Sequence, residues 1–406
     1  MSMNDAPSAA RLHIGFFGRR NAGKSSLVNA LTNQQMSIVS EVAGTTTDPV
    51  KKSMELLPLG PVVITDTPGT DDEGMLGAQR VQKTREVLGR TDVAVLVIDS
   101  EAGANEDDAA LIRIFEEEKI PFVIAWNKAD QIAETTVQKE SFLKTVPQER
   151  QIRVSAKNGT GIEELKALIG ASFGGVTKTR ALVSDIIQPG DLAVLVIPID
   201  FAAPKGRLIL PQQQVIRDIL DSGAQALCVR ESELAAALAN AGRRPALVIT
   251  DSQAFKLVSR IVPEEIPLTS FSILMARFKG VLEGQLQGLL AIDELKDGDL
   301  VLISEGCTHH RQCGDIGTVK IPAWLRDYTG RDIRIETSSG LSFPEELRKY
   351  KVIIHCGGCM LSEREVRTRN QRALRAGVPI TNYGMLIAKT QGILERAIRP
   401  LNGTEI

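Results

Sequence analysis

Two groups of cysteine and histidine residues carry the most distinctive chemistry in this 406-residue sequence. One is His355-Cys356-Gly357-Gly358-Cys359, which follows the apolar run Val352-Ile353-Ile354. After it comes Ser362-Glu363-Arg364-Glu365, a pattern typical of a helix N-terminus. The other group begins with Cys307-Thr308-His309-His310 and follows the apolar run 300–303. If the two runs are parallel neighbouring strands, their ends meet, and three thiols converge on one site.

Three thiolates at one site fit more than one kind of centre. With one histidine they complete a tetrahedral Zn²⁺ site. They also suit a [4Fe–4S] cluster in which one iron is left open or weakly held. A redox-active pair of Cys356 and Cys359 is a third interpretation. We expect the following helix to lower the pKa of these thiols, and the two glycines between them favour a cluster mildly, because they free backbone amides to approach sulfide.

A phosphate loop lies near the start of the sequence. Residues 12–17 predict a strand, Gly18–Ser25 match the pattern G-x-x-x-x-G-K-[ST], and residues 26–31 continue as a helix. The glycines let backbone amides face phosphate oxygens, Lys24 supplies a charge for the terminal phosphates, and Ser25 offers an oxygen to Mg²⁺. The strand–loop–helix context makes a nucleotide site the expected function of this stretch.

Further motifs follow in the order that a GTPase requires. Asp66 ends one predicted strand, where it is placed to hold Mg²⁺ through water, and the amide of Gly69 is placed to meet the γ-phosphate. Asp130 ends the stretch Asn127-Lys128-Ala129-Asp130, and its carboxylate can accept from two donors that guanine has and adenine lacks. The expected nucleotide-binding residues are Gly18, Asn21, Ala22, Gly23, Lys24, Ser25, Ser26, Asp66, Gly69, Asn127, Lys128, Asp130, Ser155, Ala156 and Lys157. The set resembles the translation-factor-like branch of small GTPases.

Residues 40–48 are expected to form the first switch, and together with Asn21 they resemble the potassium-activated GTPases similar to the tRNA-modifying GTPase family. That resemblance implies slow, potassium-stimulated hydrolysis, in which K⁺ supplies the charge of an arginine finger, worth about 10³–10⁵ in rate. The implied K⁺ ligands are Asn21, Ser40, Val42 and Thr45, and the implied Mg²⁺ ligands are Ser25 and Thr46. The implied catalytic set is Lys24, Ser25, Asn21, Thr46, Asp66 and Gly69.

Alternating strands and helices predict an α/β protein with three parallel-sheet domains, the first a P-loop small GTPase fold. The expected domains are residues 1–174, a GTPase, 175–262, a dimerisation unit, and 263–406, which carries the metal site. In the middle segment Cys228 is expected to lie buried in a strand, and residues 270–292 are expected to form one long helix.

Composition excludes some classes of function. The formal net charge is −2, which does not suggest a protein whose main partner is nucleic acid. No apolar run reaches the roughly 18 residues that span a bilayer, and the polar stretch Met1–Ala10 is unlike a secretory signal. We therefore expect a cytoplasmic protein in which the five cysteines are thiols or ligands and not disulfides.

The order of a GTPase, a middle α/β unit, Cys307-x-His309 and then His355-Cys356-x-x-Cys359 resembles the HydF family of [FeFe]-hydrogenase maturation GTPases. The resemblance implies a [4Fe–4S] cluster on Cys307, Cys356 and Cys359, with His309 or His355, or else His310, as a fourth ligand, and it leaves Cys313 outside the pattern. It also implies a homodimeric scaffold that receives a diiron H-cluster precursor from two radical-SAM maturases and delivers it to apo-[FeFe]-hydrogenase.

The alternative hypothesis is a GTPase of tRNA modification or ribosome assembly, similar to TrmE or Era, with a structural zinc site.

Overall fold

The computed structural model describes residues 9, 11–32, 50–57, 59–67, 84–131, 146–174, 180–199, 208–306, 315–340 and 342–401. The chain divides into two compact units, Met1–Lys178 and Thr179–Ile406.

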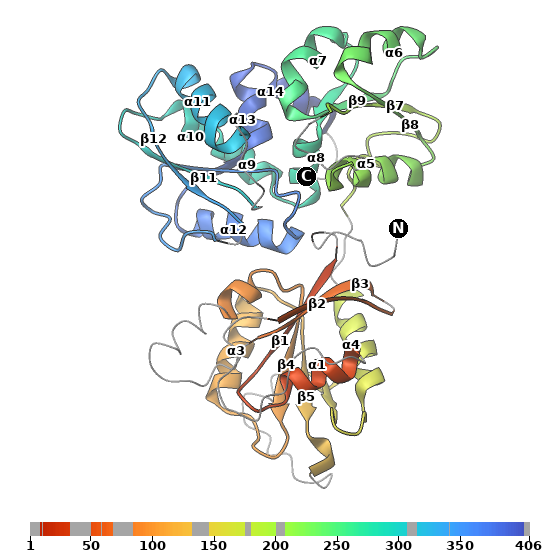
Figure 1. Cartoon of the computed structure of the whole chain (residues 1–406), viewed down its shortest axis with the longest axis vertical. Coiled ribbons are helices and arrows are strands. Elements are labelled where there is room, and N and C mark those ends of the chain that lie inside the picture. The colour runs from red at the N-terminus through yellow and green to blue at the C-terminus, as the bar shows by residue number, and fades with distance from the viewer. Residues whose placement is uncertain are drawn as a thin grey trace. The chain divides into compact units, whose positions relative to one another are not determined.

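The first unit contains a six-stranded sheet in the order β2-β3-β1-β4-β5-β6 (Figure 1). Its strands are β1 (Leu12–Phe17), β2 (Val50–Leu56), β3 (Gly60–Asp66), β4 (Val93–Asp99), β5 (Phe122–Asn127) and β6 (Gln151–Arg153). All pair in parallel except β2, an antiparallel edge strand. The central strands are buried on both faces, as their continuous apolar runs predict.

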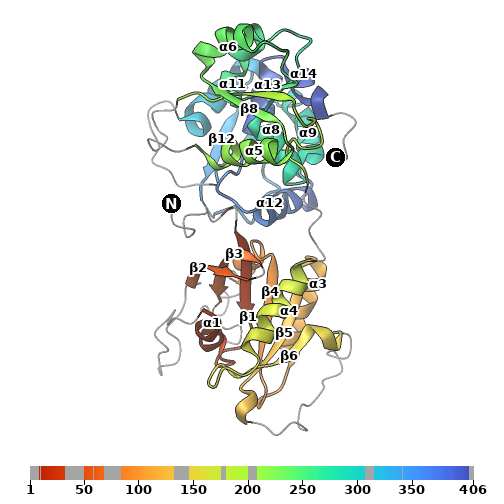
Figure 2. The same cartoon turned by 90° about the vertical axis from the view of Figure 1, so that its right-hand side faces the viewer.

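Helices cover both faces of this sheet. Residues of α1 (Lys24–Thr32) and α4 (Ile162–Gly174) share one apolar core with one face, and residues of α3 (Glu106–Glu117) share a second core with the other (Figure 2). The N-terminus of α3 is fixed by Asn105, which accepts hydrogen bonds from the amides of Asp107 and Asp108. The expected P-loop fold is confirmed.

The second unit contains two four-stranded sheets, and every strand pair in them is parallel. The first sheet has the order β10-β9-β7-β8, built from β7 (Leu192–Val196), β8 (Gln225–Val229), β9 (Leu247–Thr250) and β10 (Leu268–Ser270). The second has the order β12-β11-β13-β14, built from β11 (Leu300–Ser304), β12 (Arg334–Ser338), β13 (Val352–His355) and β14 (Ile380–Asn382).

One large apolar core joins the two sheets of the second unit. It contains Val194 and Ile249 from the first sheet together with Val301 and Ile354 from the second. The opposite face of the second sheet packs a smaller core that includes Ala373 of α12. The helices are α5 (Leu210–Asp221), α6 (Leu234–Asn240), α7 (Phe255–Ile261), α8 (Phe271–Phe278), α9 (Leu282–Gly288), α10 (Leu290–Asp293), α11 (Ile321–Thr329), α12 (Glu363–Arg375), α13 (Tyr383–Thr390) and α14 (Leu394–Ile398).

Two expectations about this unit are wrong. Residues 270–292 do not form one helix but the three helices α8, α9 and α10. Gly280 has φ of 66° just after α8, a left-handed conformation that ends a helix and that glycine adopts without strain. Cys228 lies in a strand as expected but is exposed, because β8 is an edge strand in which none of the five residues is buried.

Within the described residues, no helix has both the length and the apolar character needed to cross a bilayer.

Candidate nucleotide and metal sites

The phosphate loop owes its shape to residues with left-handed backbone angles. Gly18 has φ of 134°, Asn21 of 60° and Gly23 of 87°. A Cβ atom at Gly18 would lie 2.3 Å from the carbonyl oxygen of Val97, and one at Gly23 would lie 2.2 Å from Nδ2 of Asn127. The loop therefore lies directly against the ends of β4 and β5, and both glycines are required for that approach.

The phosphate-facing side chains lie at the N-terminus of α1. Nζ of Lys24 lies across the loop and donates hydrogen bonds to the carbonyl oxygens of Gly18 (2.8 Å) and Arg19 (2.6 Å). The hydroxyl of Ser25 donates to Oδ2 of Asp66 at 2.5 Å.

Asp66 is well suited to hold a cation. Burial raises the pKa of its carboxyl group, an effect that Ser25 and Lys24 only partly offset. Its second carboxylate oxygen, Oδ1, is buried and has no hydrogen-bond partner among the described residues. A buried carboxylate oxygen without a partner is costly, and the water shell of Mg²⁺ would satisfy it. The hydroxyl oxygen of Ser25 and the carboxylate oxygens of Asp66 therefore fit the expected Mg²⁺ site.

The expected guanine-binding residues come together at the ends of β5 and β6. Nδ2 of buried Asn127 donates to the carbonyl oxygen of Ala22 (2.9 Å), and its Oδ1 accepts from the amide of Ala156 (3.1 Å). Asn127 thus ties the phosphate loop to the Ser155-Ala156-Lys157 turn. The exposed carboxylate of Asp130 accepts from the hydroxyl of Ser155 at 2.6 Å, and this hydrogen bond holds the pKa of Asp130 below its usual value.

The remaining guanine-side residue, Lys128, has φ of 62° and pairs with Asp99 at 2.6 Å. Five residues expected in the nucleotide site lie outside the described part of the chain: Ser40, Val42, Thr45, Thr46 and Gly69.

The two strands that precede the cysteine groups are parallel neighbours, as expected. β11 pairs with β13, and Ser304 lies opposite His355. The amide of Cys356 donates to the carbonyl oxygen of Ser304 at 2.8 Å, and the amide of Gly306 donates to Sγ of Cys356 at 3.0 Å. The residue before Cys307 is thus in contact with the Cys356 sulfur.

Four residues of this group, Cys307, His309, His310 and Cys313, lie outside the described residues. Over the ranges that the structure does describe, no three cysteine, histidine, aspartate or glutamate side chains are grouped to hold a metal ion. Within those ranges the site supplies two thiols, those of Cys356 and Cys359.

The expectation that the helix end lowers the thiol pKa values is wrong for the protein without metal. Burial raises the pKa of Cys356 against the lowering effect of the amides of Gly306 and Gly358. Burial and the neighbouring Cys356 raise the pKa of Cys359 against the lowering effect of Lys279. Desolvation therefore outweighs the favourable dipoles. A half-buried thiol pair that accepts backbone N–H hydrogen bonds suits an iron–sulfur cluster, whose sulfur ligands accept such bonds.

His355 is already engaged on both sides of its ring. Its Nδ1 lies 2.7 Å from the carbonyl oxygen of Cys356, and its Nε2 lies 3.2 Å from a guanidinium nitrogen of Arg369. Burial and Arg369 lower the pKa of His355 to about 4, so the ring is neutral at pH 7, donates from Nδ1 and accepts at Nε2. These contacts speak against His355 as the fourth cluster ligand, and His309 stays a prediction.

The helix after the cysteine loop starts as predicted. The hydroxyl of Ser362 accepts from the amide of Glu365 at 3.2 Å, which fixes the N-terminus of α12. The side chain of Glu365 pairs with Arg369 at 2.6 Å, and both side chains are buried.

Lys279 is a residue of this site that the sequence did not suggest. Its side chain is buried, and its Nζ donates to the carbonyl oxygens of Gly358 (2.6 Å) and Leu361 (3.1 Å). These partners are about 80 residues away in the sequence, so only the fold brings them together. A lysine just after an apolar helix carries no signal for such a contact.

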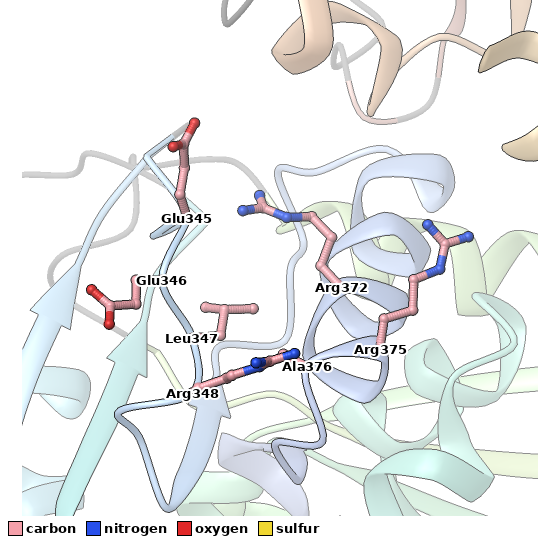
Figure 3. A pocket seen from close by; sticks show the side chains of 7 residues that line it. All are labelled: Glu345, Glu346, Leu347, Arg348, Arg372, Arg375 and Ala376. Carbon is pink, nitrogen blue, oxygen red and sulfur yellow. The ribbon is translucent and has the colours of Figure 1, made fainter.

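An open pocket of about 420 Å³ lies at the C-terminal end of α12, the end opposite Ser362. It is lined by Glu345, Glu346, Leu347, Arg348, Arg372, Arg375 and Ala376. Figure 3 shows Arg372 extending from α12 toward the segment 345–348, whereas Arg375 extends from the same helix away from that segment. None of these seven residues is a cysteine or histidine, and we assign the pocket no part in the metal site.

The strand order of the first unit and the convergence of its loop, Asp66 and Asn127–Asp130 define a P-loop GTPase domain, a class that binds GTP and GDP with Mg²⁺. Residues 13–128 match the family model of the 50S ribosome-binding GTPase. Residues 182–280 match that of the hydrogen maturase F dimerization domain, and residues 283–400 that of the hydrogen maturase F tetramerization domain. The chain belongs to the hydrogen maturase F (HydF) family.

Curated relatives match the GTPase part. The tRNA modification GTPase MnmE of Laribacter hongkongensis is 33% identical over 175 residues, which are 42% of this chain and 37% of that protein. MnmE of Heliobacterium modesticaldum is 38% identical over 154 residues, 37% of this chain and 32% of that protein. The chain thus spans about a third of the length of these relatives.

Among solved structures, Aquifex aeolicus Era bound to GDP and AlF4⁻ is similar at 18% identity and a TM-score of 0.35, over 54% of this chain and 93% of that one. That TM-score is too low to support a fold assignment, which rests on the strand order of the first unit.

Proposed function

We propose that this chain is a GTP-hydrolysing scaffold that binds a [4Fe–4S] cluster and assembles and delivers the diiron H-cluster precursor to apo-[FeFe]-hydrogenase. The observation that carries the proposal is the contact between the ends of β11 and β13. The amide of Gly306 lies 3.0 Å from Sγ of Cys356, and Gly306 immediately precedes Cys307 in the sequence, which supports the inclusion of all three cysteines in one site.

In this proposal Cys307, Cys356 and Cys359 hold the cluster, and His309 is the candidate for the fourth position. When bound, a cluster held by three thiolates offers one iron on which an incoming ligand of the diiron unit can bind. The described residues prepare the site for it. Gly306 and Gly358 donate hydrogen bonds to Sγ of Cys356, and the apolar core of the second unit packs against Cys356.

The GTPase part is proposed to hydrolyse GTP slowly and to be stimulated by K⁺. Support comes from Asn21, which holds a left-handed backbone conformation within the phosphate loop, and from the MnmE likeness of this part of the chain. The proposed K⁺ ligands are Asn21, Ser40, Val42 and Thr45, and the proposed Mg²⁺ ligands are Ser25 and Thr46, with Asp66 acting through water.

The proposed partners are the two radical-SAM maturases and the apo-hydrogenase. The family models of residues 182–280 and 283–400 are those of dimerization and tetramerization domains, which supports an oligomer. A homodimer remains the proposed minimal state, and the division into three domains at residues 174 and 262 remains a prediction.

The alternative, a role in tRNA modification with structural zinc, is supported by the names of the MnmE relatives. Those matches extend over about 40% of the chain, and the remainder, with the cysteine groups, matches hydrogen maturase F domains. We therefore favour the scaffold.

The experiment that tests this proposal measures transfer of the diiron precursor to apo-[FeFe]-hydrogenase. The chain is reconstituted anaerobically with iron and sulfide, loaded with a diiron precursor, separated from free precursor and mixed with apo-[FeFe]-hydrogenase. The proposal expects hydrogen evolution from the mixture and none when Cys356→Ser replaces the parent chain. Equal activation by the parent and the Cys356→Ser variant would refute the carrier role.

A further inference from the structure

The two sheets of the second unit repeat one motif. In each, the first strand is central, the second lies on one side of it, the third on the other, and the fourth outside the third. The turns into the first strands also match. Gly190 and Gly298 have φ of 87° and 83°. The following residues, Asp191 and Asp299, each accept from the amide three positions earlier at 2.8 Å.

The two sheets with their helices are two copies of this motif, the first built on β7–β10 and the second on β11–β14, and the ends of the two copies match as well. Ser270 and Asn382 each cap the helix after the fourth strand by accepting from the amide three residues on. These helices, α8 and α13, both have eight residues. They end at Lys279-Gly280 and at Gln391-Gly392, in which the glycines have φ of 66° and 71°. Lys279 and Gln391 are therefore equivalent positions of the two copies.

The copies exchange contacts across their common core. Helix α9 of the first copy packs on β14 of the second, and α14 of the second packs on β10 of the first. The loop after the third strand behaves in the same way. A Cβ at Gly357, in the cysteine loop, would lie 3.9 Å from Ser272 of α8, and the equivalent loop of the first copy contacts α13.

Lys279 is the residue of the first copy that contacts the proposed metal site of the second. It belongs to the first copy, yet its Nζ donates to the carbonyl oxygens of Gly358 and Leu361, which bracket Cys359. Its own carbonyl oxygen accepts from Nε of Arg367 on α12 at 2.9 Å, so its backbone is fixed too. The equivalent loop of the first copy, Asp251-Ser252-Gln253-Ala254, has no cysteine, and the residue equivalent to Lys279 is the neutral Gln391. A lysine is thus present in the copy pairing that contains the thiols, where burial lowers its pKa and the neighbouring Cys359 and Cys356 act to raise it, and a neutral glutamine occupies the equivalent position of the other pairing.

We propose that Lys279 is a positioning residue for the cluster: it fixes the Cys356–Cys359 loop and supplies a buried positive charge that stabilises the reduced cluster. This inference rests on the proposed cluster function. A cation held in a poorly solvated site next to the cysteine ligands favours the state with the more negative charge, and the charge and hydrogen bonds around a cluster set its reduction potential.

The experiment is a redox titration of the anaerobically reconstituted full chain, followed by electron paramagnetic resonance, with iron and sulfide counted for each variant. Lys279→Met removes the charge and both hydrogen bonds, Lys279→Gln keeps amide donors without charge, and Lys279→Arg keeps the charge. In the Lys279→Met and Lys279→Gln variants we expect the ratio of reduced to oxidised cluster at a fixed potential to fall at least tenfold. For a one-electron couple this corresponds to a shift of about 59 mV. Arg should stay within about threefold of the parent.

Gln391→Met is the matched control, because it replaces the side chain at the equivalent position, and the equivalent loop, Asp251-Ser252-Gln253-Ala254, contains no cysteine. It should leave the iron content and the midpoint unchanged. If the Lys279→Met variant loses its iron while the Lys279→Arg variant retains it, the proposal is supported, because a positive charge at this position then decides whether iron is retained. Met and Gln variants that hold iron with the midpoint of the parent would overturn it. A parent chain that takes up no iron would instead refute the proposed cluster function itself.

Discussion

The Arg369–Glu365 pair behind the cysteine loop gives a stability prediction with a definite size. Arg369 is 2% exposed and Glu365 is 7% exposed, and their side chains meet at 2.6 Å on successive turns of α12. Arg369 also donates to the carbonyl oxygen of Gly340 at 2.8 Å and lies 3.2 Å from Nε2 of His355. Arg369→Met therefore removes this cation from the buried carboxylate of Glu365 and this donor from two acceptors.

The expected loss of stability follows from these contacts. Removing one partner of a buried ion pair costs about 3–5 kcal/mol, because the remaining charge stays desolvated. For a unit of this size each kcal/mol lowers Tm by about 2–4 °C, so the transition of the second unit should fall by about 10 °C. Adding Glu365→Gln to Arg369→Met should recover at least half of that loss, since a neutral amide is cheaper to bury than a carboxylate.

The assay is thermal unfolding of the full chain with and without saturating GDP and Mg²⁺. The ligand raises the transition of the GTPase unit, so the other transition belongs to the second unit. Arg217→Met is the control. Arg217 and Asp221 also form an i,i+4 pair at 2.8 Å, with the charges in the opposite order along the helix, but their side chains are 77% and 56% exposed, and such pairs contribute about 0–1 kcal/mol. A loss for Arg369→Met no larger than that for Arg217→Met would refute the reasoning.

Three further predictions concern the two units separately. Lys24→Ala should abolish GTP hydrolysis, measured as phosphate release, and leave iron content unchanged; loss of both would show that the two sites are not separable. Asn21→Ala should bring the ratio of GTPase rates in K⁺ and Na⁺ to about one, and a ratio equal to that of the parent would rule out Asn21 as a K⁺ ligand. Although burial acts to raise the pKa of Asp185, its bond to Arg277 lowers it overall, so the pair stabilises the fold above the unfolded pKa of about 3.9 and loses that effect as pH falls through the folded value. In urea titrations Asp185→Asn should therefore be less stable than the parent at pH 7, and the difference should shrink as the pH falls through the lowered pKa of Asp185; a difference independent of pH would contradict this.

Much of the nucleotide site could be predicted because its signals are local. A phosphate loop is defined by neighbouring residues, and the left-handed angles of Gly18, Asn21 and Gly23 arise within six positions. That β11 and β13 are parallel strands with their C-terminal ends at one edge of a sheet was also predictable, because strands and helices alternate in this part of the chain; that the two strands are direct neighbours entered only as a condition. Both inferences needed only residue type and order.

What escaped the sequence depends on contacts between distant segments. The engagement of His355 by Arg369 and of Gly358 by Lys279 follows from packing, which no spacing encodes. The pKa of the thiols was misjudged for the same reason: the helix dipole is visible in the sequence, whereas the extent of burial is not. The break at Gly280 was a local signal that the apolar pattern of residues 270–292 obscured.

The most direct test of the central claim is the metal content of the chain after anaerobic reconstitution. A chain that binds a [4Fe–4S] cluster should be brown, with about four irons and four acid-labile sulfides per chain. Cys307→Ser, Cys356→Ser and Cys359→Ser should each lose that iron while GTP hydrolysis persists. A colourless chain that holds one tightly bound zinc ion, released by the same three substitutions, would contradict this claim.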